Sequence, residues 1–583
     1  MLFRELFRKK SIPSILGDSV AGEHTGLRKS LNVFDLTGLG IAAVVGAGIF
    51  STIGTSAVSG GPAVSILFLF TAMACGFSAL CYAQFASVIP ISGSAYTYAY
   101  ASFGELIAWI IGWDLIMEYA IGNIAVAISW SDYFSGFMGG IGLPIPDFLC
   151  IDYLSAARGY QQVVTEMAKG VSFSSLSGML QESYLAWQNA PSIGGFRIIV
   201  DLPAFSIVVF ISMLVYIGIY ETKLASNTMV VLKIAILLLI ITVGAFYINP
   251  ANWSPFAPHG ISGVLKGVSG VFFAYIGFDA ISTTAEECRN PKKDMPRAII
   301  FALLITTILY ILISLVLTGM VHYSELGVGD PLAYAFEKLH LTKLSGIIAI
   351  SAVIAMASVL LVFQVGQPRI WLSMSRDGLL PKAFSKIHKR FKTPSFSTII
   401  AGILVAIPSL FMNLTEVTDL TSIGTLFAFI LVSGGVLVLD NGHSAKEESV
   451  LGSGFRIPYI NSRYFLPLLW IAVAVLVYYL NPQQIEKFTS ILNPTAGVSG
   501  ILRLEFPVII FIIVAIVMTF FSIWKQFSLI PVLGLLTNFY LMAQLGITNW
   551  LRFLVWLAIG LILFFTYGIK HSKLRKNSSN KPS

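Results

Sequence analysis

The sequence predicts an all-α polytopic membrane protein with about 14 transmembrane helices, and three observations lead to this fold class. Of the 583 residues, 56% are apolar and 11% are charged, whereas soluble domains average roughly 45–50% and about 25%. The mean hydropathy of +0.81 excludes a disordered chain, a coiled coil and a secreted disulfide scaffold. The apolar residues also form blocks of about 20, the length that a helix needs to cross a bilayer.

Fourteen apolar blocks have this length. The tail before them, residues 1–34, is basic and lacks the apolar core of a signal peptide, so we expect it to stay in the protein. The predicted spans lie near residues 36–57, 62–88, 105–134, 203–220, 224–248, 264–287, 297–321, 344–366, 396–413, 419–439, 464–480, 505–524, 527–545 and 551–569. Because their number is even, both termini fall on the same side of the membrane.

The distribution of Lys and Arg predicts the orientation. With these spans, 27 of the 37 basic residues lie on the side of the termini and 9 on the opposite side, so the positive-inside rule places both termini in the cytoplasm. The same bias accounts for the net charge of +8 without nucleic acid. The longest connection, residues 137–201, is then extracellular. We expect it to cap the extracellular mouth, with short helices at 160–169 and 174–189.

The cysteines indicate neither a disulfide nor a metal site. Cys75 and Cys81 share one span, and Cys150 and Cys288 fall in loops on opposite faces of the membrane. The sequence contains no C-x-x-C pair and no Cys/His spacing typical of zinc. We therefore expect neither a metal nor a cofactor.

Two spans contain small residues where a helix is easily interrupted. The first span has Gly46, Ala47 and Gly48 at its centre, and the sixth has Gly277 followed by Asp279. The two spans are equivalent if two five-helix halves are related by inverted topology, and helices interrupted in matching places indicate a transporter binding site. Freed N–H groups suit a carboxylate and freed C=O groups suit an ammonium, which favours a zwitterionic amino acid. Close helix packing through glycine is the alternative for the first span.

Four ionisable side chains lie at membrane depth. Lys233 is about 14 Å into the fifth span and Glu118 about 20 Å into the third, at 1.5 Å per residue. A charge at the bilayer centre costs about 2.5–3.5 kcal/mol, so such residues are functional candidates. Lys233 is a candidate proton carrier, because a dry lysine loses its proton readily; a permanent Lys–carboxylate pair is the alternative. We expect Asp114 and Asp279 to be structural.

Several segments also carry a resemblance to a known family. They are GLGIAAVVGAGIF at 38–50, FFAYIGFDAISTTAEECRNPKKDMPRAI at 272–299 and SRDGLLPKAFSKIHKRFKTP at 375–394. In these segments the chain resembles the amino acid–polyamine–organocation permeases. The residues around Glu118 and Lys233, and the tail at 528–568, are similar to the cationic amino-acid transporter branch.

The resemblance implies a five-plus-five inverted-repeat transporter core that works by alternating access. It implies that backbone amides in the first span hold the substrate carboxylate, at Gly46, Ala47 and Gly48. It implies that carbonyls of the first and sixth spans hold the amino group, near Val44, Phe273, Ala274 and Ile276. It also implies that Lys233 titrates in proton coupling and faces a hydroxyl of the eighth span, for which Ser358 is the candidate. Glu118 would line the pocket and meet a basic side chain.

These repeats divide the chain into five parts. They are a cytoplasmic tail (1–34), a first repeat (35–250), a second repeat (260–440), four C-terminal helices (441–569) and a basic cytoplasmic tail (570–583). Two features depart from the family pattern: loop 137–201 is enlarged, and the two spans within 464–524 are insertions.

The sequence thus predicts a secondary active amino-acid transporter of the cell membrane, the inner membrane if the source is bacterial. Protons are the expected coupling ion, and the lipid bilayer is the other partner. ATP-driven transport would need a partner protein, because the Walker A motif is absent, and an enzyme is not expected, because the H-E-x-x-H motif is absent. A channel would need rings of pore-lining groups rather than two broken helices. An exchanger, or a nutrient sensor that binds without transporting, would use the same pocket and remains an alternative.

Overall fold

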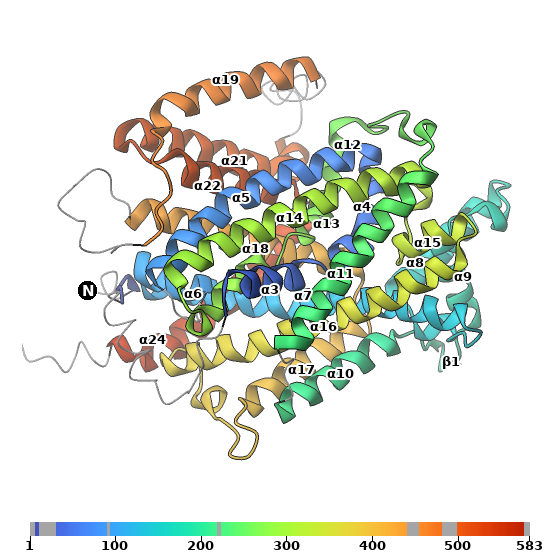
Figure 1. Ribbon diagram of the computed structural model, residues 1–583, viewed down its shortest axis with the longest axis horizontal. Helices are drawn as coiled ribbons and strands as arrows, with labels where there is room; N and C mark the ends of the chain where they lie inside the picture. Colours follow the sequence, from blue (N-terminus) through green and yellow to red (C-terminus); the bar gives the residue numbers. More distant parts are fainter. Residues whose placement is uncertain are drawn as a thin grey trace, which may run out of the picture.

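The fold was analysed in a computed structural model that describes residues 6–10, 31–89, 94–218, 223–439, 454–480 and 498–575. Most helices run along one direction of the molecule (Figure 1). The described residues at both ends of the chain lie at one end of this bundle, which we call the terminal end. The long connection lies at the other, the cap end. Most of the two tails predicted at 1–34 and 570–583 falls outside the described residues.

The first repeat begins with an interrupted helix. Asn32 and Asp35 form a capping box that starts α3. Asp201 caps α10, in which Pro203 occupies the first turn. The elements of this repeat are α3 (Val33–Val44), a π-helix (Gly48–Thr52), α4 (Ile53–Gly60), α5 (Val64–Val88), α6 (Ser94–Ser102), α7 (Glu105–Gly140), α10 (Leu202–Ile217) and α11 (Lys223–Gly244).

The second repeat also begins with an interrupted helix. Its elements are α12 (Gly260–Lys266), α13 (Val268–Phe273), a 3-10 helix (Phe278–Glu287), α14 (Pro291–Met320), α15 (Pro331–Lys338), α16 (Thr342–Arg376), α17 (Ser395–Ser409) and α18 (Leu414–Leu439). Helix α16 continues ten residues beyond the predicted end of its span at 366.

The packing of the two repeats follows inverted symmetry. Two pairs of long helices in matching positions pack against each other: α5 against α14, and α7 against α16. The short helix between the second and third helices of each repeat lies at the terminal end in the first repeat (α6) and near the cap end in the second (α15) (Figure 1). The predicted all-α fold class is confirmed.

Each of the fourteen predicted spans coincides with helical structure. Among the described residues, nine helices are long and apolar enough to cross a membrane, and five further apolar helices are shorter. How many helices cross the bilayer stays a prediction.

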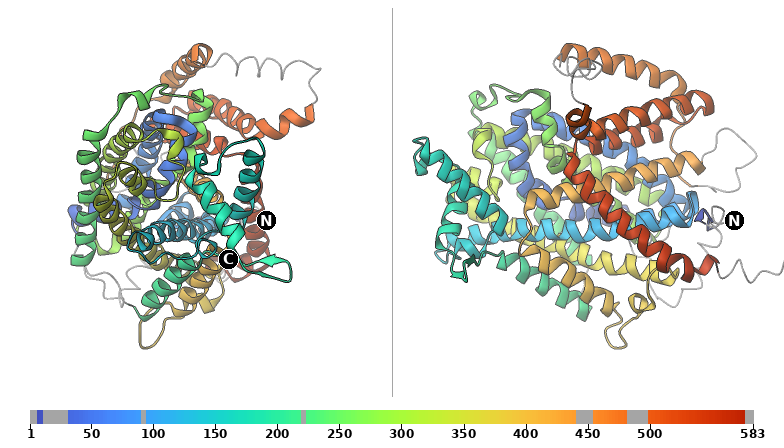
Figure 2. Two further views of the ribbon diagram at one scale, coloured as in Figure 1. Left: turned by 90° about the vertical axis from the view of Figure 1, so that its right-hand side faces the viewer. Right: turned by 180° about the vertical axis from the view of Figure 1, so that it is seen from behind.

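Four C-terminal helices cover one side of the repeats. They are α19 (Ser462–Leu480), α21 (Val498–Lys525), α22 (Leu529–Gln544) and α23 (Ile547–Leu563), followed by a π-helix (Phe564–Gly568) and α24 (Ile569–His571). Helix α22 packs against α5 and α18, whereas α19 contacts α21 and α22 and lies at the periphery (Figures 1 and 2). Helix α23, red in Figure 2, runs obliquely across the bundle. The two helices predicted as insertions therefore lie outside the repeat core.

The long connection 137–201 forms a small layer with its own core. It contains α8 (Tyr153–Ala168), α9 (Gly178–Asn189) and a hairpin of β1 (Ser192–Ile193) and β2 (Phe196–Arg197). The helix predicted at 160–169 begins seven residues earlier than expected, because Asp152 caps it by accepting a bond from the backbone N–H of Ser155. Asn413 donates a hydrogen bond to Ser155, and Arg158 pairs with Glu416 at 3.6 Å. The layer is thus joined to the outer end of α18.

At the terminal end, Asp377 joins four segments of the chain. Its carboxylate pairs with Lys10 Nζ at 3.2 Å and accepts a bond of 2.8 Å from the Tyr96 hydroxyl in α6. Its backbone carbonyl accepts a bond of 3.1 Å from the N–H of Lys573. One residue at the end of α16 therefore connects the N-terminal segment, α6 and the C-terminal segment.

We predict that Asp377→Ala lowers the apparent melting temperature of the detergent-solubilised protein. The substitution removes the carboxylate that pairs with the Lys10 ammonium and accepts the hydrogen bond of the Tyr96 hydroxyl, a loss of about 1–3 kcal/mol. Glu166→Ala, which removes an exposed ion pair with Lys169, is the control and should cost about 0–1 kcal/mol. Equal melting temperatures for the two variants would contradict the role of Asp377.

Candidate substrate site between two broken helices

The first predicted break is present in the structure. Helix α3 ends at Val44, Val45 is extended with φ −77° and ψ 94°, and helical structure resumes as a π-helix at Gly48. The first N–H groups of a helix have no acceptor within it, and the last C=O groups have no donor. This break therefore brings free amides and free carbonyls together at the middle of a span.

The second predicted break is present at the matching place. Helix α13 ends at Phe273, and the chain then turns through Gly277, whose φ of 116° is a left-handed value that suits glycine. A 3-10 helix follows from Phe278. Across this turn, the Phe273 carbonyl still accepts a bond of 3.2 Å from the N–H of Ile276.

The two breaks pack directly on each other. A Cβ atom on Gly48 would overlap the Cα of Ala274, and one on Gly277 would lie 3.0 Å from the carbonyl oxygen of Ala43. Gly46 instead faces α16, where a Cβ would lie 3.0 Å from a methyl group of Val359. The small residues thus allow the backbones of the two spans to touch. Close helix packing through glycine, the alternative to a binding site, therefore involves the same glycines that are predicted to bind the substrate.

Hydroxyl groups hold the second half of the first span. Thr52 Oγ1 lies 2.7 Å from the carbonyl oxygen of Gly48 and 2.8 Å from that of Gly270, and the two carbonyls share its single proton, which joins the first and sixth spans. The Tyr133 hydroxyl of α7 donates to the Phe50 carbonyl at 2.6 Å. Neither Thr52 nor Tyr133 was a sequence candidate. Both lie in short runs of polar residues within apolar spans, and such runs were the signal available for them.

Lys233 reaches the first span. Its Nζ donates a hydrogen bond of 2.7 Å to the carbonyl of Ala42, and its side chain is 1% exposed. Ala42 lies in the last turn of α3, where carbonyls lack helical donors. The Ser358 hydroxyl is also buried but donates to the Ala355 carbonyl of its own helix at 3.0 Å. Its pairing with Lys233 stays a prediction.

Three carboxylates meet between α7, α18 and the 3-10 helix. Glu118 lies beside Asp279, Asp114 and the hydroxyl of Thr425, and all three acids are at most 4% exposed. Within the described part of the chain, neither oxygen of Asp114 has a hydrogen-bond partner. Asp279 follows the second break by two residues. Glu118 was predicted to line the pocket and Asp279 to be structural, but the fold brings the two acids together beside the second break.

A tyrosine that the sequence analysis did not select contacts the first break. The Tyr310 hydroxyl of α14 donates a hydrogen bond of 3.0 Å to the carbonyl of Val44. The Val44 carbonyl was predicted to contact the substrate amino group. The bond from Tyr310 already occupies one of its two lone pairs. A tyrosine at the centre of an apolar span was the signal that could have identified it.

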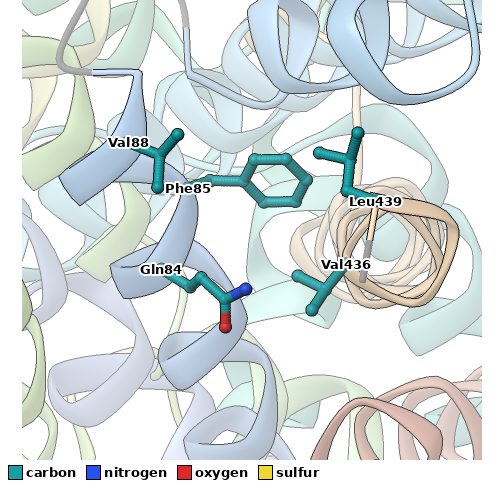
Figure 3. A pocket seen from close by; sticks show the side chains of 5 residues that line it. All are labelled: Gln84, Phe85, Val88, Val436 and Leu439. Atoms are coloured by element: carbon teal, nitrogen blue, oxygen red, sulfur yellow. The ribbon is translucent and has the colours of Figure 1, made fainter. Parts of the chain in front are cut away.

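Two cavities lie away from the breaks in the first and sixth spans. One, of about 10 Å³, lies between α5 and α18 and is lined by Gln84, Phe85, Val88, Val436 and Leu439 (Figure 3). It is large enough for about one water molecule. The other, of about 420 Å³, lies between the cap-end parts of α7 and α10 and is almost entirely apolar, with Trp130, Leu202 and Phe210 in its lining. Neither has the polar groups that a zwitterion needs.

The cap end carries several acids outside the spans. Burial raises the pKa of Glu182 and of Asp201 to about 7, and that of Asp330 to about 8. Near neutral pH these carboxyls are therefore partly protonated, and the cap end is less negative than its acid count suggests.

Comparisons with known proteins identify the family. The amino acid permease family matches residues 31–499, and the family that describes the C-terminus of these permeases matches residues 528–572. The chain belongs to the amino acid permease family. It is a transporter-family protein and not an enzyme, as the sequence predicted.

Relatives of this permease cover almost its whole length. The branched-chain amino acid permease BcaP of Bacillus subtilis is 38% identical over 572 residues, which cover 98% of this chain and 99% of BcaP. The methylthioribose transporter of Bacillus subtilis is 40% identical and covers 82% of this chain and 97% of its own. The vacuolar cationic amino acid transporter 4 of Arabidopsis thaliana is 32% identical, and the match covers 98% of this chain and 96% of the transporter.

We predict that Gly48→Ala in this permease abolishes transport, whereas Gly46→Ala impairs it partially. A methyl group at position 48 meets the backbone of Ala274, which cannot move aside, but at position 46 it meets a side-chain methyl of Val359. Overpacking of the second kind costs about 1–3 kcal/mol, and the part of this cost that falls on the substrate-bound state raises the KM, about tenfold for each 1.4 kcal/mol.

Uptake into proteoliposomes measures both effects. The double variant Gly46→Ala/Val359→Ala should restore the KM, because it removes the methyl groups that the new Cβ meets. Normal transport by Gly48→Ala would show that the two breaks do not need to touch.

Proposed function

We propose that this permease is a secondary active transporter that takes up amino acids together with protons by alternating access. The observation that carries the proposal is the contact between two half-helix pairs whose backbones are interrupted at the same depth. Unwound backbone inside a membrane is tolerated where it lines a polar site, and it offers donors and acceptors without side chains. A small zwitterion needs both.

The substrate carboxylate binds the amides at the start of the second half-helix, those of Gly46, Ala47 and Gly48. Helix N-termini carry a partial positive charge and point their N–H groups at such anions. The ammonium binds carbonyls at the ends of the two first halves, those of Val44, Phe273, Ala274 and Ile276. The carbonyls of Val44 and Phe273 accept one bond already, which leaves each a second lone pair for the ammonium.

Proton coupling operates through Lys233. The charged form donates to the Ala42 carbonyl and holds the first half-helix against α11. The neutral form donates more weakly, because a hydrogen bond from a charged donor is roughly twice as strong as a neutral one. Loss of the proton therefore loosens α3 next to the substrate site. In this proposal the neutral amine of Lys233 moves away from α3 and donates a hydrogen bond to the hydroxyl oxygen of Ser358.

The side chain of the substrate faces Glu118 and Asp279. Two carboxylates that lie next to each other and beside the site favour a cationic side chain, since a buried charge needs a partner. The names of the relatives include branched-chain and cationic amino acids and, for one, methylthioribose. We infer that cationic amino acids are the preferred substrates, and that the protein lies in the cell membrane with its terminal end in the cytoplasm.

Flux into proteoliposomes tests the proposed function. A panel of cationic, branched-chain and small neutral amino acids, with methylthioribose, is measured with and without an inward proton gradient and with and without sodium. The proposal predicts accumulation of amino acids that depends on the proton gradient and not on sodium. Flux that requires amino acid inside the vesicles would identify an exchanger. Saturable binding without accumulation would identify a sensor.

We predict that Lys233→Ala abolishes the pH dependence of uptake while the protein is still inserted in the membrane. The variant cannot change its charge at the end of α3. Uptake is measured at several external pH values, with Lys343→Ala as the control, because Lys343 is exposed at the start of α16. A pH profile that is the same in wild type and Lys233→Ala would refute Lys233 as the proton carrier.

We predict that Glu118→Gln raises the KM for cationic amino acids by about tenfold relative to that for neutral ones. The change removes an acid that can ionise and pair with a cationic side chain bound beside it, and contacts to charged groups are worth about 1.5–3 kcal/mol. The measurement is the ratio of the two KM values in each protein, so that differences in expression cancel. An equal loss for both substrate classes would indicate a structural or proton-linked acid.

A further inference from the structure

The last carbonyls of α3 need hydrogen-bond donors from other parts of the protein. They have no donors within the helix, and no bulk water reaches the middle of a bilayer. The N–H of Val45 bonds to the carbonyl of Ile41 at 2.8 Å. The Ala42 carbonyl binds Lys233 of α11, and the Val44 carbonyl binds Tyr310 of α14. Side chains from two other helices therefore hold two of the carbonyls in the last turn of α3.

Packing fixes the direction of the Tyr310 hydroxyl. The side chain is fully buried, and its ring meets those of Phe68 at 5.7 Å and Tyr275 at 5.5 Å between centroids, both edge to face. The Tyr275 hydroxyl is directed elsewhere and donates to the carbonyl of Phe68 at 3.1 Å. Because a buried hydroxyl without a partner is costly, the bond to Val44 is the reason a tyrosine is stable at this position.

We propose that Tyr310 is a positioning residue that orients the Val44 carbonyl toward the ammonium of the substrate. This inference rests on the proposed function. A carbonyl oxygen has two lone pairs, so the bond from Tyr310 fixes the direction of the second one. Without that bond the carbonyl is free to turn, and the end of α3 can adopt other conformations. The ammonium then meets an acceptor that is not preorganised.

Tyr310 differs from Lys233 in what it controls. Both donate to the same end of α3, but the lysine changes its charge with the proton and the tyrosine hydroxyl serves as a neutral donor. Removal of the tyrosine hydroxyl should therefore affect the affinity for the amino group and leave the coupling to pH intact. This separates the inference from a general weakening of the site.

The test compares Tyr310→Phe with wild type in the same proteoliposomes. We expect the KM for the best amino-acid substrate to rise about tenfold, the loss of one buried hydrogen bond, with an unchanged maximal rate and an unchanged pH profile. The inhibition constant of the 2-hydroxy acid with the same side chain, which lacks the ammonium, should rise by less than twofold.

Thr306→Val is the matched control. Thr306 lies one turn before Tyr310 on α14, is equally buried, and donates to the Ala302 carbonyl of its own helix at 2.9 Å. This variant removes a buried hydroxyl from the same helix without affecting α3, so its KM should equal that of wild type.

Four results would overturn the inference. An unchanged KM in Tyr310→Phe, or an equal rise for the amino acid and the hydroxy acid, would show that Tyr310 only supports the fold. A tenfold rise in Thr306→Val would show that any lost hydroxyl in α14 has the same effect. Wild-type protein that accumulates none of the amino acids would refute the proposed function itself, and this inference with it.

Discussion

The structure depends on one constraint: backbone groups freed inside a bilayer must find partners within the protein. Helix α3 ends at Val44, in the middle of the first span, and releases carbonyls where water is absent. Lys233, Tyr310 and Tyr133, from three different helices, donate to the carbonyls on either side of this break. These hydrogen bonds connect the surrounding helices to the stretch of backbone that is proposed to bind the substrate.

Small residues make the second contribution. Gly48 lies against Ala274, and Gly277 against Ala43, so the two interrupted spans touch through their main chains. In the proposed site, amides of the first span and carbonyls of both spans supply the two polarities that a zwitterion requires. The same glycines that allow the spans to pack closely are those proposed to bind the carboxylate. A side chain at position 48 would separate the spans.

Much of this arrangement could be predicted from the sequence, because it depends on local features. The length of apolar blocks predicts the helices, and Gly46-Ala47-Gly48 predicts the break in the first span. The sequence could not predict which side chains satisfy the break, since the Tyr310 contact joins residues 266 positions apart. The proximity of Glu118 and Asp279 has the same origin, because it follows from the packing of two repeats. Ser358 illustrates the opposite limit: its place in the eighth span was clear, but its hydroxyl bonds to its own helix.

A structure determined with a bound amino acid would test the central claim most directly. The account predicts that the carboxylate lies within hydrogen-bond distance of the amides of Gly46–Gly48, and that the ammonium contacts the carbonyls of Val44 and Ala274. A ligand bound elsewhere, for example in the apolar cavity between α7 and α10, with both breaks unchanged and empty, would contradict it.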